Sequence, residues 1–224
     1  MTKFTHRILA CLALGVVVAA AVSGRANTPE VHWGGDFRPI KPEVALLKAV
    51  EAMGVKQNFI LAEVRGKSVA FGGTEKATVV VTVYADGNGS QITVLAAGEG
   101  AEGLRNSIRT HIFDGKFNPK TPPVIRTKDA SRKMGGPAVL VKQARSSRSP
   151  DDFLRLGKES MGRQGLGVET LDGGTTLCGS DANGYAVAMH DPIRGSKNHM
   201  LRVFGVAFDH DWAEQFRNAV AGDV

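Results

Sequence analysis

The same order of elements is predicted twice along the chain, and this repetition constrains the fold more than any other feature. In both copies a proline opens an amphipathic helix, at Pro42 and Pro150, and a Met-Gly pair ends it. Both copies close with a second amphipathic helix, over residues 101–112 and 212–220. Between the helices, Gly-rich turns separate predicted strands at 59–64, 68–71, 78–84 and 91–96, and at 166–171, 175–178, 185–189 and 200–208.

This order predicts an α+β fold made of a tandem pair of two-layer units. In each unit antiparallel β-hairpins form a sheet, and two helices cover its apolar face. The two units are expected side by side, sharing either an interface or a sheet. Matching segments are offset by 108 residues at the first helices and by 112 at the last ones, which favours an internal duplication.

The first 26 residues predict a cleavable signal peptide. Lys3, His6 and Arg7 precede an apolar run over residues 8–22, and small residues follow up to Ala26. This run of about 15 residues is shorter than the roughly 20 that a membrane-spanning helix needs. We therefore expect export to the periplasm or to the outside of the cell, with no transmembrane segment after cleavage.

Removal of the leader changes the charge and the cysteine content. Three of the 28 basic residues and none of the 22 acidic ones are lost, so the formal net charge falls from +6 to +3. Cys11 is also lost, and its place at the start of the apolar run argues against a lipid anchor. Cys178 then has no partner for an intramolecular disulfide, so stability must come from a hydrophobic core.

A basic segment, residues 116–148, lies between the two predicted units. It contains nine basic residues and one acidic residue, a net charge of +8, together with many prolines, glycines and serines. This composition is typical of a connector. The chain is thus divided into a signal peptide (1–26), a first unit (27–115), the connector (116–148) and a second unit (149–224).

The connector offers a candidate polyanion site at Lys142, Arg145 and Arg148. Lipopolysaccharide phosphates and anionic lipid headgroups are ligands of this class. Nucleic acid fits poorly, because the segment has a single aromatic residue, Phe117, to stack on bases and because export is predicted. The alternative is internal, with the +8 connector lying over units that sum to −5.

No motif predicts a specific reaction, and we expect no cofactor. Residues 98–103 read Gly-Glu-Gly-Ala-Glu-Gly, but the strand before them is predicted to be antiparallel, and the two glutamates would repel a pyrophosphate. Cys178 is a candidate nucleophile, with His190 or His210 as its base. The simpler interpretation is that Cys178 packs inside the protein, as free cysteines commonly do.

His190, Asp191 and His199 form a candidate metal site. If strands 185–190 and 199–208 pair, the two histidines flank one loop and approach each other, with Asp191 as a third ligand. Histidines at loop ends are otherwise solvated or capping. An aspartate before the last helix has an equally simple explanation as an N-cap, which accounts for the acidic residues around His210.

The favoured function is an exported, non-catalytic binding or structural protein of the cell envelope. The first alternative is an exported enzyme or metal-binding protein that uses Cys178 or the group of His190, Asp191 and His199. The second is polyanion binding through the connector. No feature of the sequence identifies a ligand or a partner.

Overall fold

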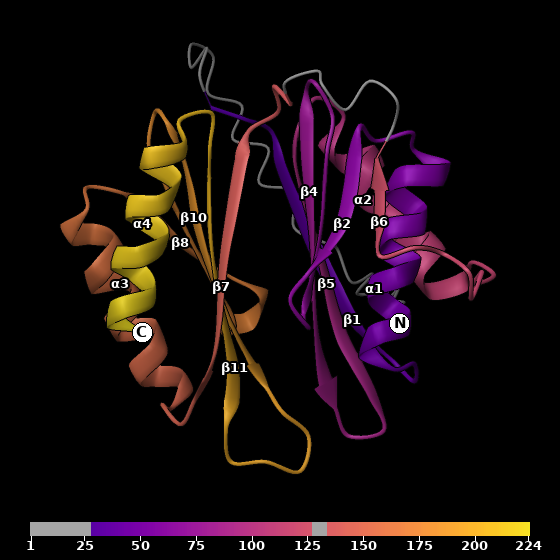
Figure 1. Ribbon diagram of the computed structural model, residues 1–224. Coiled ribbons are helices and arrows are strands. Elements are labelled where there is room, and N and C mark those ends of the chain that lie inside the picture. Colours follow the sequence, from indigo (N-terminus) through magenta and orange to yellow (C-terminus); the bar gives the residue numbers. More distant parts are fainter. Residues whose placement is uncertain (1–27, 127–133) are drawn as a thin grey trace, which may run out of the picture.

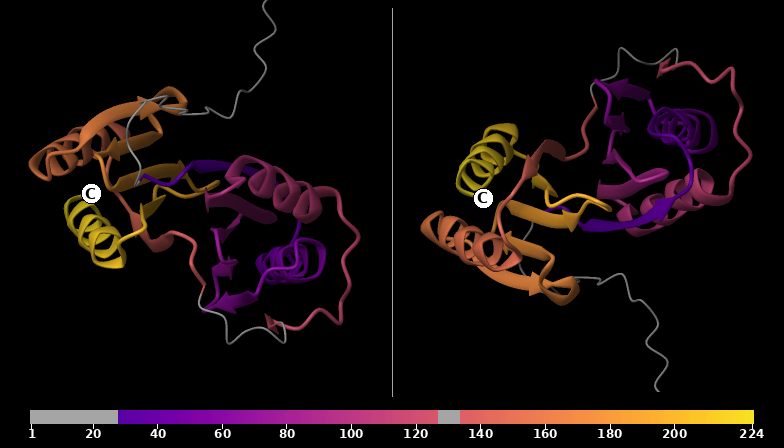
Figure 2. Two further views of the ribbon diagram at one scale, coloured as in Figure 1. Left: turned by 90° about the horizontal axis from the view of Figure 1, so that it is seen from above. Right: turned by 90° about the horizontal axis from the view of Figure 1, so that it is seen from below.

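The computed structural model describes residues 28–126 and 134–224, so the predicted signal peptide lies outside the described residues. In these residues two antiparallel sheets face each other, and each carries two α-helices on its outer face (Figure 1). The views from above and below show the same four layers, with both sheets inside and the helix pairs outside (Figure 2). The predicted α+β tandem of two-layer units is therefore confirmed.

The first unit has a six-stranded sheet with the order β1-β5-β4-β3-β2-β6. Its elements are β1 (Val31–Arg38), α1 (Pro42–Glu51), the π-helical turn η1 (Ala52–Lys56), β2 (Leu61–Arg65), β3 (Val69–Gly73), β4 (Ala77–Asp86), β5 (Gly89–Gly98), α2 (Ala101–Asp114) and β6 (Val124–Arg126). The helices and the outer face of the sheet enclose a core that includes Met53, Val81 and Ile108.

The second unit has a five-stranded sheet with the order β7-β11-β10-β9-β8. Its elements are β7 (Ala138–Ser146), α3 (Pro150–Arg163), β8 (Gly167–Leu171), the short 3-10 helix η2 (Asp172–Gly174), β9 (Thr176–Ser180), β10 (Gly184–Pro192), β11 (His199–Ala207) and α4 (His210–Asp223). Phe153, Leu177 and Val220 belong to the core beneath its helices.

Both units follow one connectivity. In each, an edge strand precedes the first helix, four strands follow as a meander, and the last of them returns beside the edge strand before the final helix. The strand orders β1-β5-β4-β3-β2 and β7-β11-β10-β9-β8 are therefore equivalent, and β6 is an addition to the first unit. Equal connectivity is what an internal duplication predicts; the duplication itself stays a prediction.

Three strands, β1, β6 and β7, are not predicted by the sequence pattern. Two of them lie within residues 116–148: β6 pairs with β2, and β7 pairs along its whole length with β11. The interpretation of 116–148 as a bare connector is therefore corrected, because this segment supplies an edge strand to each sheet. Its prolines and charges conceal the strands, since edge positions tolerate both.

Local signals start the helices where the sequence predicts them. At α3, the Ser149 hydroxyl accepts a hydrogen bond from the backbone N–H of Asp152 at 3.1 Å. At α4, the Asp209 carboxylate accepts from the backbone N–H groups of Asp211 and Trp212, so the predicted N-cap is confirmed. No helix within 28–126 or 134–224 is long and apolar enough to span a membrane.

A third core joins the two units where their sheets face each other. Val80 and Leu95 of the first sheet are buried against Phe204 and Val206 of the second. Trp33 of the edge strand β1 lies in this core and also lines a pocket between the sheets. The packing of the units thus positions the candidate site.

Candidate ligand pocket between the sheets

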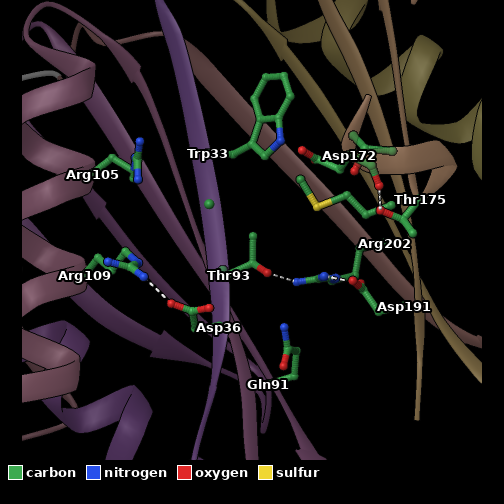
Figure 3. A pocket seen from close by; sticks show the side chains of 14 residues that line it. Trp33, Asp36, Gln91, Thr93, Arg105, Arg109, Asp172, Thr175, Asp191 and Arg202 are labelled. Carbon is green, nitrogen blue, oxygen red and sulfur yellow. Dashed lines mark hydrogen bonds and ion pairs between the residues drawn. The ribbon is translucent and has the colours of Figure 1, made fainter. Parts of the chain in front are cut away.

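A pocket of about 410 Å³ lies between the sheets, beside the edge strand β1 (Figure 3). Its walls come from β1, β5 and α2 of the first unit, and from β9, β10, β11 and the η2 turn of the second. This volume lies in the range of pockets that take small organic molecules. Because both units contribute to its lining, the pocket is a product of their packing.

Two adjacent glycines of β1 keep this edge of the pocket narrow. A Cβ atom at Gly34 would lie 3.1 Å from Nη1 of Arg105 on α2. A Cβ atom at Gly35 would lie 2.6 Å from both the Thr93 hydroxyl oxygen and the Ile92 carbonyl oxygen on β5. The lack of side chains therefore lets a guanidinium approach one face of β1 while the other face stays open over Thr93.

Arg202 on β11 is the most buried charged residue of the pocket, with 1% of its surface exposed. Its guanidinium donates to the hydroxyl groups of Thr82, at 3.2 Å, and Thr93, and to the carboxylate of Asp191. These bonds compensate the burial of the charge, and two of them cross from one sheet to the other. Arg202 therefore helps to fix the packing of the units while its charge is already neutralised.

Asp36 and Arg109 form a second ion pair at the mouth of the pocket. Both side chains are partly exposed, and the guanidinium carbon of Arg109 also lies 4.7 Å from the centre of the Phe113 ring. The pair connects the edge strand β1 to helix α2. Like Arg202, Arg109 has its charge neutralised within the protein.

Arg105 and Asp172 line the same pocket, and neither has an ion-pair partner among the described residues. The Nε atom of Arg105 is buried and has no hydrogen-bond partner there. Burial and then the adjacent Arg109 lower the pKa of Arg105, while Glu102 acts in the opposite direction. Asp172 is exposed and has a left-handed backbone, with φ at 52°. In Figure 3 strand β1 passes between these two residues, and the indole of Trp33 lies on the Asp172 side of the strand.

Cys178, the candidate nucleophile, lies in the core between the sheets and is 4% exposed. Burial, with a smaller contribution from Glu169, raises the pKa of its thiol to about 12. The thiol is therefore neutral near pH 7, whereas a nucleophilic cysteine acts as the thiolate. Neither His190 nor His210 contacts it in the described aromatic and polar interactions, so the structure places Cys178 as a packing residue.

His190 and His199 do approach each other, with stacked rings whose centres are 4.3 Å apart. His190 also stacks on Phe153 of α3, so both imidazoles lie on the helix side of the second sheet. Asp191 points to the opposite face of β10, where it binds Arg202. The three residues therefore do not converge, and the described residues hold no group of three histidine, cysteine or acidic side chains able to bind a metal.

The remaining candidates lie apart from one another. His210 is exposed at the start of α4, 3.7 Å from Asp211. Lys142 and Arg145 are three residues apart on β7 and so point to opposite faces of the strand, while Arg148 follows the end of β7. The predicted polyanion residues thus do not form one surface, because strand formation separates side chains that are near in sequence.

Of the charged residues that line the pocket, only Asp191 is among the sequence-based candidates, and there as a metal ligand. Arg105 and Arg109 are spaced as neighbours on one helix face, and Gly34-Gly35 interrupts a strand; these are the signals that were available. Neither signal reveals Arg202, whose partners Thr82 and Thr93 belong to the other unit. Its role depends on how the sheets pack, which no local pattern encodes.

No protein-family model matches the sequence, and no curated protein matches it either. Among solved structures, the chain is similar to the di-domain ARO/CYC StfQ from the steffimycin biosynthetic pathway, with 8% identity and a TM-score of 0.24, over 78% of this chain and 83% of that one. It is also similar to the di-domain ARO/CYC BexL from the BE-7585A biosynthetic pathway, with 6% identity and a TM-score of 0.23, over 86% of this chain and 94% of that one. No function follows from likenesses at this level.

Proposed function

We propose that this protein is exported and binds a small polar organic molecule in the pocket between its sheets, without transforming it. The observation that carries the proposal is the pocket itself, about 410 Å³ in volume and lined by three arginines and three aspartates. A space of this size with a few fixed polar groups is the usual form of a small-molecule site. Export rests on the predicted signal peptide.

The chemistry of the lining favours binding over catalysis. A general acid or base must be free to exchange a proton with the reacting group. The carboxylates of Asp36 and Asp191 are instead each held in an ion pair by an arginine. Cys178 and the stacked pair of His190 and His199 lie outside the pocket lining. The groups that face the ligand space are therefore suited to hold charges in place.

A comparison of the wild type with a blocked pocket tests this proposal. Gln91 lines the pocket and its side chain makes no hydrogen bond with the described side chains, so Gln91→Trp fills the space without removing such a bond. A panel of small amino acids, organic acids, amines and sugars is screened by thermal denaturation. We expect at least one compound to raise the Tm of the wild type by several degrees, because a ligand at about 100 times its Kd adds roughly 2.7 kcal/mol to the stability.

Thr170→Trp is the matched control, because it adds the same side chain on the exposed strand β8, outside the pocket. We expect the Tm increase to persist in Thr170→Trp and to disappear in Gln91→Trp. The proposal is wrong if no compound raises the Tm, or if the compounds that do so act equally on Gln91→Trp.

A further inference from the structure

We propose that the ligand is a small zwitterion whose opposite charges are separated along the molecule, such as an ω-amino acid or a short peptide. Its anionic group would bind Arg105 and its cationic group Asp172. This inference rests on the proposed function, since it assigns a ligand class to the same pocket.

Most of the charged residues that line the pocket are paired with one another. Six charged residues line it, and four of them neutralise one another in two ion pairs. These pairs are Arg109 with Asp36 and Arg202 with Asp191. One guanidinium and one carboxylate remain, with no ion pair to any residue in 28–126 or 134–224. A ligand that complements the lining therefore needs one negative and one positive group.

Arg105 is placed to receive the negative group. Its guanidinium packs over Gly34, and its buried Nε lacks a hydrogen-bond partner among the described residues. Burial and the adjacent Arg109 both act against its charge. A bound carboxylate would stabilise the positive charge of Arg105 against both of these effects. Its two oxygens can also accept two parallel hydrogen bonds from the planar guanidinium.

Asp172 is placed to receive the positive group. The backbone N–H and the hydroxyl of Thr175 donate to the Asp172 carbonyl oxygen, at 3.4 and 3.0 Å, which fixes the turn that presents its side chain. That side chain lines the pocket and is exposed to solvent. A carboxylate in this setting binds an ammonium group by charge-assisted hydrogen bonds.

The separation of the two residues sets the length of the ligand. Arg105 and Asp172 line one pocket but form no ion pair with each other, so a molecule that reaches both must carry its charges apart. In Figure 3 the edge strand β1 runs between them, with Arg105 on one side and Asp172 and the Trp33 indole on the other. Trp33 and Met189 belong to the apolar core between the sheets and line the pocket there, which suits the hydrocarbon or peptide part of the ligand.

Isothermal titration calorimetry with matched compounds tests the inference. The probes are 6-aminohexanoate and triglycine as zwitterions, with hexanoate and hexylamine as the corresponding single charges. We expect the better zwitterion to bind the wild type at least about tenfold more tightly than either singly charged compound. Tighter binding of triglycine would identify a peptide ligand, and tighter binding of 6-aminohexanoate an amino-acid ligand.

Charge-removing variants assign the two ends. Arg105→Gln should reduce the zwitterion affinity to that of hexylamine, and Asp172→Asn should reduce it to that of hexanoate. Arg163→Gln is the control, because Arg163 pairs with Asp223 on the outer helices and lies outside the pocket. Circular dichroism checks that each variant folds. If Arg105→Gln does not fold, Arg105→Lys takes its place. This variant keeps the positive charge but lacks the planar guanidinium, and it should lose less zwitterion affinity than is predicted for Arg105→Gln.

The outcomes separate this inference from the proposed function. It is overturned if hexanoate or hexylamine binds as tightly as the zwitterions, or if Arg163→Gln weakens binding as much as Arg105→Gln. It is also overturned if none of the four probes binds while another compound of the screening panel raises the Tm, which leaves the pocket as a binding site. If no compound binds in either experiment, both proposals fail.

Discussion

The charged side chains of the pocket are of two kinds: those neutralised within the protein and those without an ion-pair partner among the described residues. Arg202 is fully enclosed; its two terminal nitrogens donate to Thr82, Thr93 and Asp191, while its Nε has no hydrogen-bond partner among the described residues. Removing one partner from such a set leaves a buried charge uncompensated, which is strongly destabilising. Arg105 and Asp172 instead keep their charges available at the pocket. The first kind stabilises the packing of the sheets, and the second kind is suited to recognition.

His190 makes the stability depend on pH. It is 3% exposed; burial and then His199 lower its pKa, while a hydrogen bond with the Arg148 backbone and the charge of Asp191 act in the opposite direction. Because the folded pKa lies below the unfolded value of about 6.5, the unfolded chain takes up the proton first as the pH falls. The stability contributed by neutral His190 is therefore present above this value and is lost as the pH falls toward the folded pKa.

His190→Phe should weaken this dependence while keeping the stack on Phe153. Urea unfolding at about pH 7.5 and at about pH 5 gives the loss of unfolding free energy for each protein. We expect a smaller loss for His190→Phe than for the wild type, and an unchanged loss for His210→Gln, which alters an exposed histidine. Equal losses in the wild type and His190→Phe would contradict the assignment.

The two glycines of β1 differ in what an added side chain would contact. At Gly34 an added Cβ meets the flexible end of Arg105, which can move, whereas at Gly35 it meets the Ile92 carbonyl oxygen of the paired strand. Gly34→Ala should therefore change the unfolding free energy by less than about 0.5 kcal/mol, and Gly35→Ala should lower it by roughly 1 to 3 kcal/mol. Urea unfolding measures both values.

The same two variants also test whether β1 positions Arg105 for ligand binding. Because Gly34→Ala displaces the Arg105 guanidinium, it should weaken zwitterion binding several-fold while stability is preserved. A larger loss of stability in Gly34→Ala than in Gly35→Ala would contradict the contacts described for β1.

The helices, the central strands and the edge strand β8 are predictable from sequence, and the other three edge strands are not. Helical periodicity, Pro150 at a helix start and the Ser149 cap are local signals, and the structure follows them. Strands β1, β6 and β7 form only by pairing with β5, β2 and β11, which lie far away in the chain. Their glycines, prolines and charges resemble those of loops, so their pairing has no local signature.

In the molecule as a whole, the pocket belongs to neither unit alone. The arginines and aspartates that line it come from strands, a helix and a turn of both units, and they meet because the inner faces of the sheets pack through one apolar core. Sequence reasoning predicts two units but leaves open how they share an interface. It therefore favours clusters within one segment, such as His190 and His199, and misses the site that the packing creates.

The tryptophans allow ligand binding to be located within the molecule. The chain contains two, and only Trp33 lines the pocket, whereas Trp212 stacks on Phe216 of α4 with ring centres 4.1 Å apart. Trp212→Phe leaves Trp33 as the only indole reporter. Its fluorescence is then titrated with the tightest ligand found by calorimetry.

We predict a saturable change in Trp33 fluorescence whose Kd equals the calorimetric value. In the Trp212→Phe background, Arg105→Gln should raise this Kd at least about tenfold, as it does in calorimetry. An unchanged Trp33 signal at ligand concentrations that saturate the heat signal would place the ligand elsewhere and contradict binding between the sheets.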